Sequence, residues 1–222
     1  MTGATEGPKR RDVRFPLADL TAQLDAFALR WPAARADHTG QAFVGEGASL
    51  HVPLLAPRLA PGDAIADYRA RLPGAPETAV VLLLQAGAMA FGCWHGDELL
   101  RHKAVRKYVV RGHGRAQPLH RKTAGKSRYG SRLRLQNWQR LLVETNERLR
   151  DCWRELGPPD RVFVAIPVRV WSDLAATDPP PPFARSDANV QRVPMHVHRP
   201  DFAELQRVHG GLAHGRLELA AP

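Results

Sequence analysis

Acidic residues are missing from one long part of the chain. No aspartate or glutamate occurs in the 43 residues from Arg101 to Val143, which we call the basic segment. It holds 13 of the 32 lysines and arginines, so the rest of the chain has 19 basic residues against 22 acidic ones. The net charge of +10 therefore comes entirely from the basic segment. Cations at this density repel one another unless a polyanion neutralises them. The pattern predicts a surface that binds a phosphate backbone, and a solvated basic loop is the alternative.

Cysteines and long apolar runs are also scarce. Cys93 and Cys152 lie far apart and lack the spacing of a metal site, which predicts buried thiols in a reducing compartment rather than a disulfide framework. The most apolar run, residues 79–84, is too short to span a bilayer. Residues 1–14 are polar and basic and lack the apolar region of a signal peptide. We therefore expect a cytoplasmic protein that does not contact a membrane.

The first third of the chain is predicted to contain a tail and a small α/β unit. Residues 1–14 are expected to be a disordered tail. Within residues 15–75, apolar side chains at steps of three or four predict a helix over 16–31, which Pro32 ends. Residues 41–45 and 49–55 have the pattern of a hairpin around a Gly-Glu-Gly turn. This region is expected to form a small N-terminal helix-plus-hairpin unit.

Residues 76–222 are predicted to form the main domain. Three strands, at 79–85, 88–94 and 99–110, are predicted to form a meander. A long helix at 131–156, strands at 162–166 and 190–197, and a last helix at 200–209 follow. Residues 177–187, with four consecutive prolines, are expected to be a loop. The order predicts an α/β (α+β) fold with a mixed five-stranded sheet flanked by helices, compatible with a ribonuclease H-like arrangement.

The long helix has the clearest amphipathic pattern in the chain. Its apolar residues recur at steps of three and four, and Gly157 and two prolines follow its end. Ser131 is expected to cap its start. Trp138 and Trp153 on this helix are predicted to pack in the core rather than to stack on bases.

The middle of the basic segment contains a loop whose side chains suit ester hydrolysis. Gly112 and Gly114 give it backbone freedom, and Gln117 follows them. An amide cannot act as a general base, but it can hold a water molecule while a neighbouring backbone N–H stabilises a developing oxyanion. Because short Gly-x-x-Gln strings are common, the alternative is that Gln117 is one polar loop residue among many.

Two motifs in the region from Lys103 to Trp153 carry a family resemblance. The first is the loop Arg111-Gly112-His113-Gly114-Arg115-Ala116-Gln117, and the second is the helix start Gly130-Ser131-Arg132-Leu133-Arg134-Leu135-Gln136-Asn137. With an Asp-x-Trp at residues 151–153, this region resembles the catalytic domain of the Vms-like release factors, relatives of eukaryotic and archaeal class I translation release factors. The opening helix and hairpin look similar to the N-terminal unit of the actinobacterial, peptidyl-tRNA hydrolase branch.

The resemblance implies a ribonuclease H-like fold and hydrolysis of peptidyl-tRNA on stalled large ribosomal subunits, in ribosome rescue and quality control. Gln117 is the position that inherits the role of orienting water against the ester between peptide and tRNA. Gly114 matches the first loop glycine, Arg115 replaces the second, and Ala116 stands where Ser or Gly is usual. The implied catalytic residues are thus Gln117, Gly114 and Ala116, and no metal or organic cofactor is expected.

The expected partners are rRNA of the large subunit and peptidyl-tRNA, bound mainly through cations of the basic segment. His120 and Tyr129 are the candidates for contacts with bases. The predicted nucleic-acid-binding residues are Arg106, Lys107, Arg111, Arg115, His120, Arg121, Lys122, Lys126, Arg128, Arg132 and Arg134. The alternative function is a non-catalytic rRNA- or tRNA-binding protein in ribosome assembly or rescue, in which Gln117 is dispensable.

Three other sites are disfavoured by their residues. Gly125-Lys126-Ser127 resembles the end of a P-loop, but His120 stands where the first glycine is required. His196 and His198 form half of a possible zinc site, and a surface or structural role is favoured because no third ligand is near in sequence. A metal-dependent nuclease needs clustered carboxylates, which the basic segment does not offer.

Overall fold

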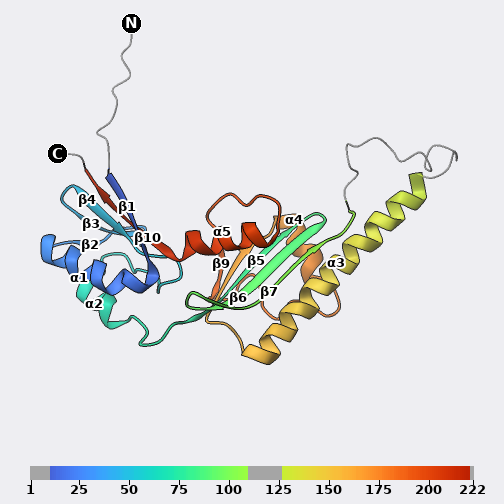
Figure 1. Ribbon diagram of the computed structural model, residues 1–222, viewed down its shortest axis with the longest axis horizontal. Coiled ribbons are helices and arrows are strands. Elements are labelled where there is room, and N and C mark those ends of the chain that lie inside the picture. Colours follow the sequence, from blue (N-terminus) through green and yellow to red (C-terminus); the bar gives the residue numbers. More distant parts are fainter. Residues whose placement is uncertain (1–10, 110–126, 221–222) are drawn as a thin grey trace, which may run out of the picture. The chain divides into compact units, whose positions relative to one another are not determined.

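The computed structural model describes residues 11–109 and 127–220 (Figure 1). The described chain forms two compact units. Unit 1 consists of the first 75 residues together with residues 209–222, and unit 2 consists of residues 76–208. In the part of the chain that is described, no helix is long and apolar enough to cross a membrane.

Unit 1 is built on a five-stranded antiparallel sheet in the order β1-β10-β4-β3-β2. Leu24, Phe43, Leu50 and Tyr68 are fully buried in its core. Its elements are β1 (Arg11–Pro16), a 3-10 turn η1 (Leu17–Asp19), α1 (Leu20–Arg30), β2 (Arg35–Ala36), β3 (Ala42–Gly45), β4 (Ala48–His51), α2 (Ile65–Ala70) and β10 (His214–Leu219). The predicted helix and hairpin are present, although α1 begins at Leu20 after η1.

The two ends of the chain meet in this sheet. β1 pairs antiparallel with β10, from Arg11 opposite Leu219 to Pro16 opposite His214. Residues 11–14 are therefore part of a strand, and the prediction of a disordered tail is wrong for them, whereas residues 1–10 lie outside the described residues. Residues 209–222 group with unit 1, outside the region 76–208 that forms unit 2. The partner strands are about 200 residues apart in sequence, so no local pattern could indicate their pairing.

Unit 2 is built on a mixed five-stranded sheet in the order β7-β6-β5-β8-β9. The predicted meander is confirmed: β5 (Thr78–Gln85), β6 (Ala88–His95) and β7 (Glu98–Arg106) pair antiparallel. β8 (Arg161–Ala165) pairs parallel with β5, and β9 (Val190–Arg192) pairs parallel with β8. The described part of the chain thus has two five-stranded sheets with helices, where the sequence predicted one five-stranded sheet and an N-terminal hairpin.

The sheet of unit 2 buries apolar residues on both faces. Leu82, Leu84 and Phe91 pack on one face against Leu141 and Leu149 of α3 (Ser127–Leu156). Strand residues alternate in direction, so Gly92 points to the opposite face, where a Cβ atom would lie 3.2 Å from Leu205 of α5 (Phe202–Leu212). Two layers of helix therefore cover the sheet, as continuous apolar strands predict. Each fully buried leucine here contributes about 1.5–3 kcal/mol to folding.

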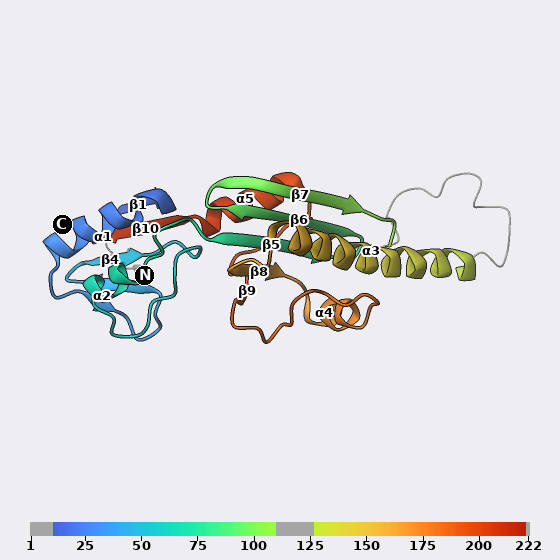
Figure 2. The ribbon, with the colours of Figure 1, turned by 90° about the horizontal axis from the view of Figure 1, so that it is seen from below.

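The α3 helix is longer than predicted. It begins at Ser127, so Ser131 lies inside it and does not cap it; its hydroxyl instead accepts a 3.1 Å hydrogen bond from Arg134. Its first turns extend beyond the end of the sheet in both views (Figures 1 and 2). The later turns of α3 pack on the sheet and so fix the direction of the helix. The first turns, where the second family motif begins, are not covered by strands.

Several other boundaries differ from those predicted. β7 ends at Arg106 and β9 at Arg192, so the predicted strands over 99–110 and 190–197 are shorter. α5 continues through the two glycines 210 and 211 to Leu212, because neither of them adopts a positive φ angle. The helix α4 (Val168–Ala175) was not predicted at all. Its eight residues make too few turns for a reliable periodic pattern.

Cys93 and Cys152 are both buried between β6 and α3, as predicted for apolar sites. The structure places their two sulfur atoms next to each other, a contact that the sequence did not predict. They are 59 residues apart in sequence, and only the packing of α3 on the sheet brings them together.

Candidate nucleic-acid interface

The structure describes the two flanks of the predicted catalytic loop. Gln117, Gly114 and Ala116 lie outside the described residues. So do six of the predicted nucleic-acid-binding residues: Arg111, Arg115, His120, Arg121, Lys122 and Lys126. Arg128 lies in the first turn of α3. The residues whose surroundings can be examined are Arg106 and Lys107 at the end of β7, and Arg132 and Arg134 on α3.

One hydrogen bond joins the two flanks. The side-chain amide of Asn137 on α3 donates to the backbone carbonyl of Tyr108, just after β7, with an N–O distance of 2.9 Å. On the β7 side, the backbone N–H of Lys107 donates to the carbonyl of Gly87 at 2.9 Å, which keeps the strand end against the neighbouring turn. The bond therefore ties the chain just after β7 to the part of α3 that lies against the end of the sheet. Asn137 is the last residue of the second family motif, and this contact gives it a physical role.

Cations at the end of β7 are paired with carboxylates from other parts of the chain. Arg106 lies 3.0 Å from Asp201 (Nη2 to Oδ2), and Lys107 lies 2.8 Å from Glu144 (Nζ to Oε2). Arg101, farther back on β7, pairs with Glu155. The sequence prediction that no carboxylate neutralises the basic segment is therefore wrong for these residues, because acidic side chains from outside the segment reach them.

Lys107 also controls the ionisation of its partner. Its ammonium group donates a hydrogen bond to Glu144, which lowers the pKa of that carboxyl group. Partial burial acts in the opposite direction, and the charges of Lys107, Arg148 and Lys103 add to the lowering. Glu144 is consequently ionised at neutral pH and holds Lys107 against α3.

Cations on the first turns of α3 are in a different situation. Arg132 and Arg140 are exposed, and no ion pair is formed by either one within residues 11–109 and 127–220. Arg132, Gln136 and Arg140 are four residues apart and share one face of the helix. Arg134 is half-buried and bonds to Ser131. Arg132 and Arg140 thus remain available to an anionic ligand.

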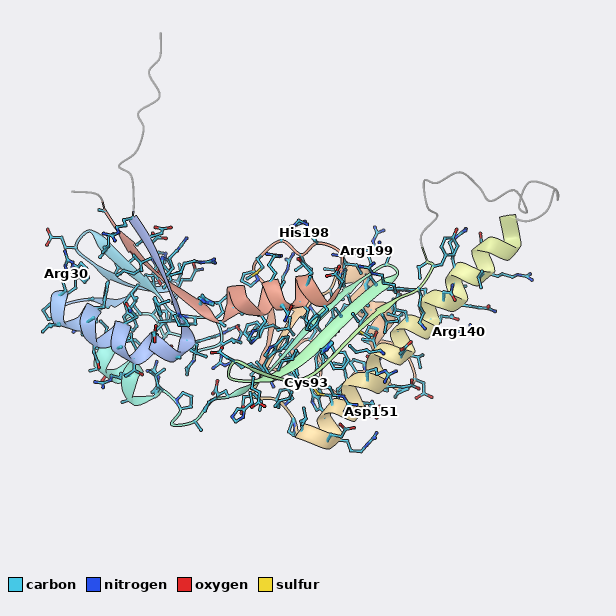
Figure 3. All side chains as sticks on the ribbon, viewed as in Figure 1. Arg30, Cys93, Arg140, Asp151, His198 and Arg199 are labelled. Atoms are coloured by element: carbon cyan, nitrogen blue, oxygen red, sulfur yellow. A yellow bond between two sulfur atoms is a disulfide. The ribbon has the colours of Figure 1, made fainter. Side chains whose placement is uncertain are left out.

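An open groove runs between the end of β7 and α3. It has a volume of about 620 Å³ and is lined on one side by Lys107 and on the other by polar side chains of α3, including Gln136, Gln139 and Arg140. Farther along α3 the lining is mixed in charge, with Glu144, Glu147, Arg148 and Asp151. Figure 3 labels Arg140 in the basic part of this helix and Asp151 in the mixed part. The basic part is the one next to the predicted catalytic loop.

The remaining candidates occupy structural or surface positions. Trp138 packs against the core of unit 2, and its indole N–H donates to Asp173 at 3.1 Å; Trp153 packs against the same core. The rings of His196 and His198 lie 4.7 Å apart and both residues are exposed. Among the described residues, no three His, Cys, Asp or Glu side chains gather as a metal site requires.

Sequence reasoning missed Asn137, Asp201 and Glu144 as parts of this interface. Asn137 stood inside a recognised motif, which is the one signal that could have indicated it. The two acidic residues lie outside the basic segment in sequence, and only the packing of α3 and α5 on the sheet brings them to β7.

Known proteins are similar in sequence to the part of the chain that contains this candidate interface. Residues 79–218, well over half of the chain, match the family model described as Bacteroidetes VLRF1 release factor. The tRNA endonuclease ANKZF1 of Mus musculus is 33% identical over 139 residues, covering 61% of this chain and 18% of that protein. The Homo sapiens protein of the same name is 31% identical over 137 residues, covering 60% and 19%. The chain thus spans about a fifth of the length of these relatives.

A solved structure also resembles the chain. The Vms1 mitochondrial localization core aligns with a TM-score of 0.49 and 13% identity, covering 93% of this chain and 82% of that one. The family match includes every strand of the unit 2 sheet and the whole of α3, together with the Asn137 contact between the flanks of the loop. The chain belongs to the VLRF1 release factor family.

Proposed function

We propose that this protein is a peptidyl-tRNA hydrolase that frees nascent chains from stalled large ribosomal subunits, in the cytoplasm. The observation that carries the proposal is the Asn137–Tyr108 hydrogen bond, which joins the two described flanks of the segment that contains Gln117. On the α3 flank lie exposed cations that have no carboxylate partner among the described residues. Membership in a release factor family and relatives named for an action on tRNA support the same substrate.

In the proposed mechanism Gln117 orients a water molecule against the ester carbonyl between the peptide and the tRNA. The water oxygen forms a bond to the carbonyl carbon, and a backbone N–H of the 111–117 loop stabilises the oxyanion. The bond to the ribose oxygen then breaks, so the peptide leaves as a carboxylic acid and the ribose hydroxyl receives a proton from the attacking water. Arg132 and Arg140 hold nearby phosphates, which positions the ester. No metal or organic cofactor is required.

The fold of unit 2 is consistent with this assignment. Its mixed sheet, covered by α3 on one face and α5 on the other, supports a ribonuclease H-like arrangement. We propose that the chain belongs to the branch of its family that hydrolyses peptidyl-tRNA.

A second function is favoured by one observation. The relatives from Mus musculus, Bos taurus and Homo sapiens are all named tRNA endonucleases. An endonuclease cleaves a phosphodiester of the tRNA, so the peptide stays attached to a short 3′ fragment. A hydrolase cleaves the ester, so the peptide is free and the tRNA keeps its full length.

The test is peptide release from large subunits that carry a labelled peptidyl-tRNA. Gln117→Ala is expected to lower the release rate about 10²- to 10³-fold, the size of losing one oxyanion-type contact. Binding to the subunits should persist. Gln23→Ala, which removes an amide from α1 in unit 1, is the matched control. Unchanged release by Gln117→Ala would contradict the proposed role of Gln117, and the absence of release by the wild type would favour the non-catalytic RNA-binding alternative.

The products separate the two enzymatic functions. Electrophoresis of the tRNA and chromatography of the peptide, from the same reaction, show which bond was broken. Full-length tRNA with free peptide supports the hydrolase, whereas shortened tRNA with a peptidyl fragment contradicts it.

A further inference from the structure

The loop between β9 and α5, residues 193–201, is held in a single conformation by side chains around it. Gln85, at the end of β5, donates its side-chain amide to two backbone carbonyls of the loop, those of Val197 at 3.1 Å and His198 at 2.9 Å. One amide thus fixes two consecutive peptide groups that belong to no helix or strand. We call residues 193–201 the histidine loop.

A second clamp comes from the first turns of α5. The carboxylate of Glu204 accepts a 2.6 Å hydrogen bond from the backbone N–H of His198, and Arg207 donates to the carbonyl of His196 at 2.7 Å. Glu204 and Arg207 also bond to each other through two contacts of 2.7 and 2.8 Å. Arg207, followed by the His198 N–H, lowers the pKa of Glu204 to about 2, so the clamp is charged at neutral pH.

The rigid backbone displays basic and aromatic side chains. His196, His198 and Arg199 are exposed, and the two imidazole rings lie 4.7 Å apart at an interplanar angle of 81°. Figure 3 shows His198 and Arg199 on the outer side of the loop. Arg192, at the end of β9, is exposed as well. No aspartate or glutamate occurs in residues 188–200.

The histidine loop lies at the edge of the sheet where β7 ends. β5, β7, β8 and β9 run in one direction, so their carboxyl ends share this edge. Arg106, at the end of β7, contacts Asp201 at 3.0 Å, and the rings of His102 and Phe202 lie 4.2 Å apart. These contacts hold the end of the histidine loop against the strand from which residues 110–126 depart.

We propose that the histidine loop and the end of β9 form a second RNA-binding contact, in which Arg192 and Arg199 bind phosphates and one of the two imidazoles stacks against an unpaired base. The two acidic neighbours, Glu204 and Asp201, pair with Arg207 and Arg106, so the exposed arginines and histidines fit a polyanion. An exposed ring on a fixed backbone fits the stacking that single-stranded RNA offers. The proposal rests on the proposed function for its choice of partner, RNA, and not on any role of Gln117.

The test measures binding to peptide-free, purified large ribosomal subunits as a function of salt, so that no readout depends on hydrolysis. At about 0.1 M salt, loss of one phosphate contact is expected to weaken binding about five- to eightfold, because each contact contributes about 0.7–0.9 to the slope of log affinity against log salt. The variant R192A/R199A should therefore bind about 25- to 60-fold more weakly and lose about 1.4–1.8 of the slope. Arg185→Ala is the matched control, since Arg185 is exposed and precedes β9 instead of following it; it should bind as the wild type does.

A second variant separates positioning from charge. Gln85→Leu removes both hydrogen bonds to the loop carbonyls and leaves every charge in place. Affinity should fall about two- to fivefold while the salt slope stays unchanged, because the same cations make the contact from a less ordered loop. Thermal melting followed by circular dichroism checks that the fold persists.

Two outcomes overturn the proposal. One is binding of R192A/R199A with the affinity and slope of Arg185→Ala. The other is a loss of binding to intact subunits without a loss of binding to protein-free rRNA and deacylated tRNA, which would indicate an acidic ribosomal protein as the partner. A third result is release of peptide by Gln117→Ala at the wild-type rate while R192A/R199A shows the expected loss of binding affinity. That result would contradict the proposed role of Gln117 and would still support this contact.

Discussion

The two flanks of the predicted catalytic loop carry similar cations in opposite electrostatic situations. At the end of β7, Arg106 and Lys107 each lie within 3.0 Å of a carboxylate. On α3, Arg132 and Arg140 are exposed and have no such partner in the described parts of the chain. A paired cation must give up its carboxylate to bind a phosphate, whereas an unpaired one loses only water. Charge counted along the sequence therefore overstates the charge that is available to RNA.

The largest effect is expected on the unpaired flank. Replacing both Arg132 and Arg140 by alanine should weaken binding to large subunits about 25- to 60-fold at about 0.1 M salt and reduce the salt slope by about 1.4–1.8. Binding is measured by sedimentation or fluorescence over a salt series. Arg154→Ala is the control on the same helix, because Arg154 already pairs with Asp151. An equal loss with Arg154→Ala would remove the distinction between paired and unpaired cations.

A smaller effect is expected where the two flanks are joined. Asn137→Ala removes the hydrogen bond to Tyr108 and should lower peptide release about tenfold, since misplacement of a catalytic loop raises the barrier without removing its chemistry. Binding to subunits should change less than twofold. Gln23→Ala, which removes an amide from α1 in unit 1, is the control. If Asn137→Ala lowers binding and release in parallel, the contact serves RNA affinity and not loop placement.

The paired flank should respond in stability more than in binding. Lys107→Met leaves the partly buried carboxylate of Glu144 without its closest partner and is expected to destabilise the protein by about 1 kcal/mol. The free energy of unfolding is measured in urea. The salt slope of RNA binding should change by much less than it does for the α3 cations. A slope loss as large as that of Arg132→Ala would mean that Lys107 exchanges its carboxylate for phosphate.

The smallest effect is expected on the pH dependence of stability that comes from the Lys107–Glu144 pair. The pKa of Glu144 is lower in the folded protein than in the unfolded chain, so its contribution is fully present above the unfolded pKa and is lost as pH falls through the folded value. Glu144→Gln should therefore narrow the stability difference between pH 7 and acidic conditions, by about 0.5 kcal/mol for an ion pair this exposed. Urea unfolding across a pH series measures it. An unchanged pH dependence would show that Lys107 and Glu144 are not coupled in solution.

Local patterns predicted those elements that bury one consistent face. The continuous apolar run of β5 indicates a buried strand, and the spacing of Leu142 and Leu149 indicates a helix. In each case this is the conformation that buries those side chains together. Short or exposed elements escaped prediction. β1 has four exposed residues followed by the buried Phe15, and α4 is only eight residues long, so neither has a period that stands out.

The residues of the candidate site likewise fall into those that the sequence could indicate and those that it could not. Arg132 and the other cations could be named from charge alone, and Asn137 from its motif. Which cations are neutralised could not be named, since Asp201 and Glu144 contribute through packing between elements that are distant in sequence. The placement of Gln117 remains a prediction, because it lies outside the described residues.

Local sequence indicated where positive charge gathers and which strands and helix form the centre of unit 2, because composition and periodicity are properties of neighbouring residues. The tertiary fold was needed to show that β1 pairs with β10, that Cys93 meets Cys152, and that carboxylates neutralise Arg106 and Lys107 but, among the described residues, neither Arg132 nor Arg140. The reason is physical: such contacts join residues whose separation along the chain is large, and only the burial of apolar faces brings them within bonding distance.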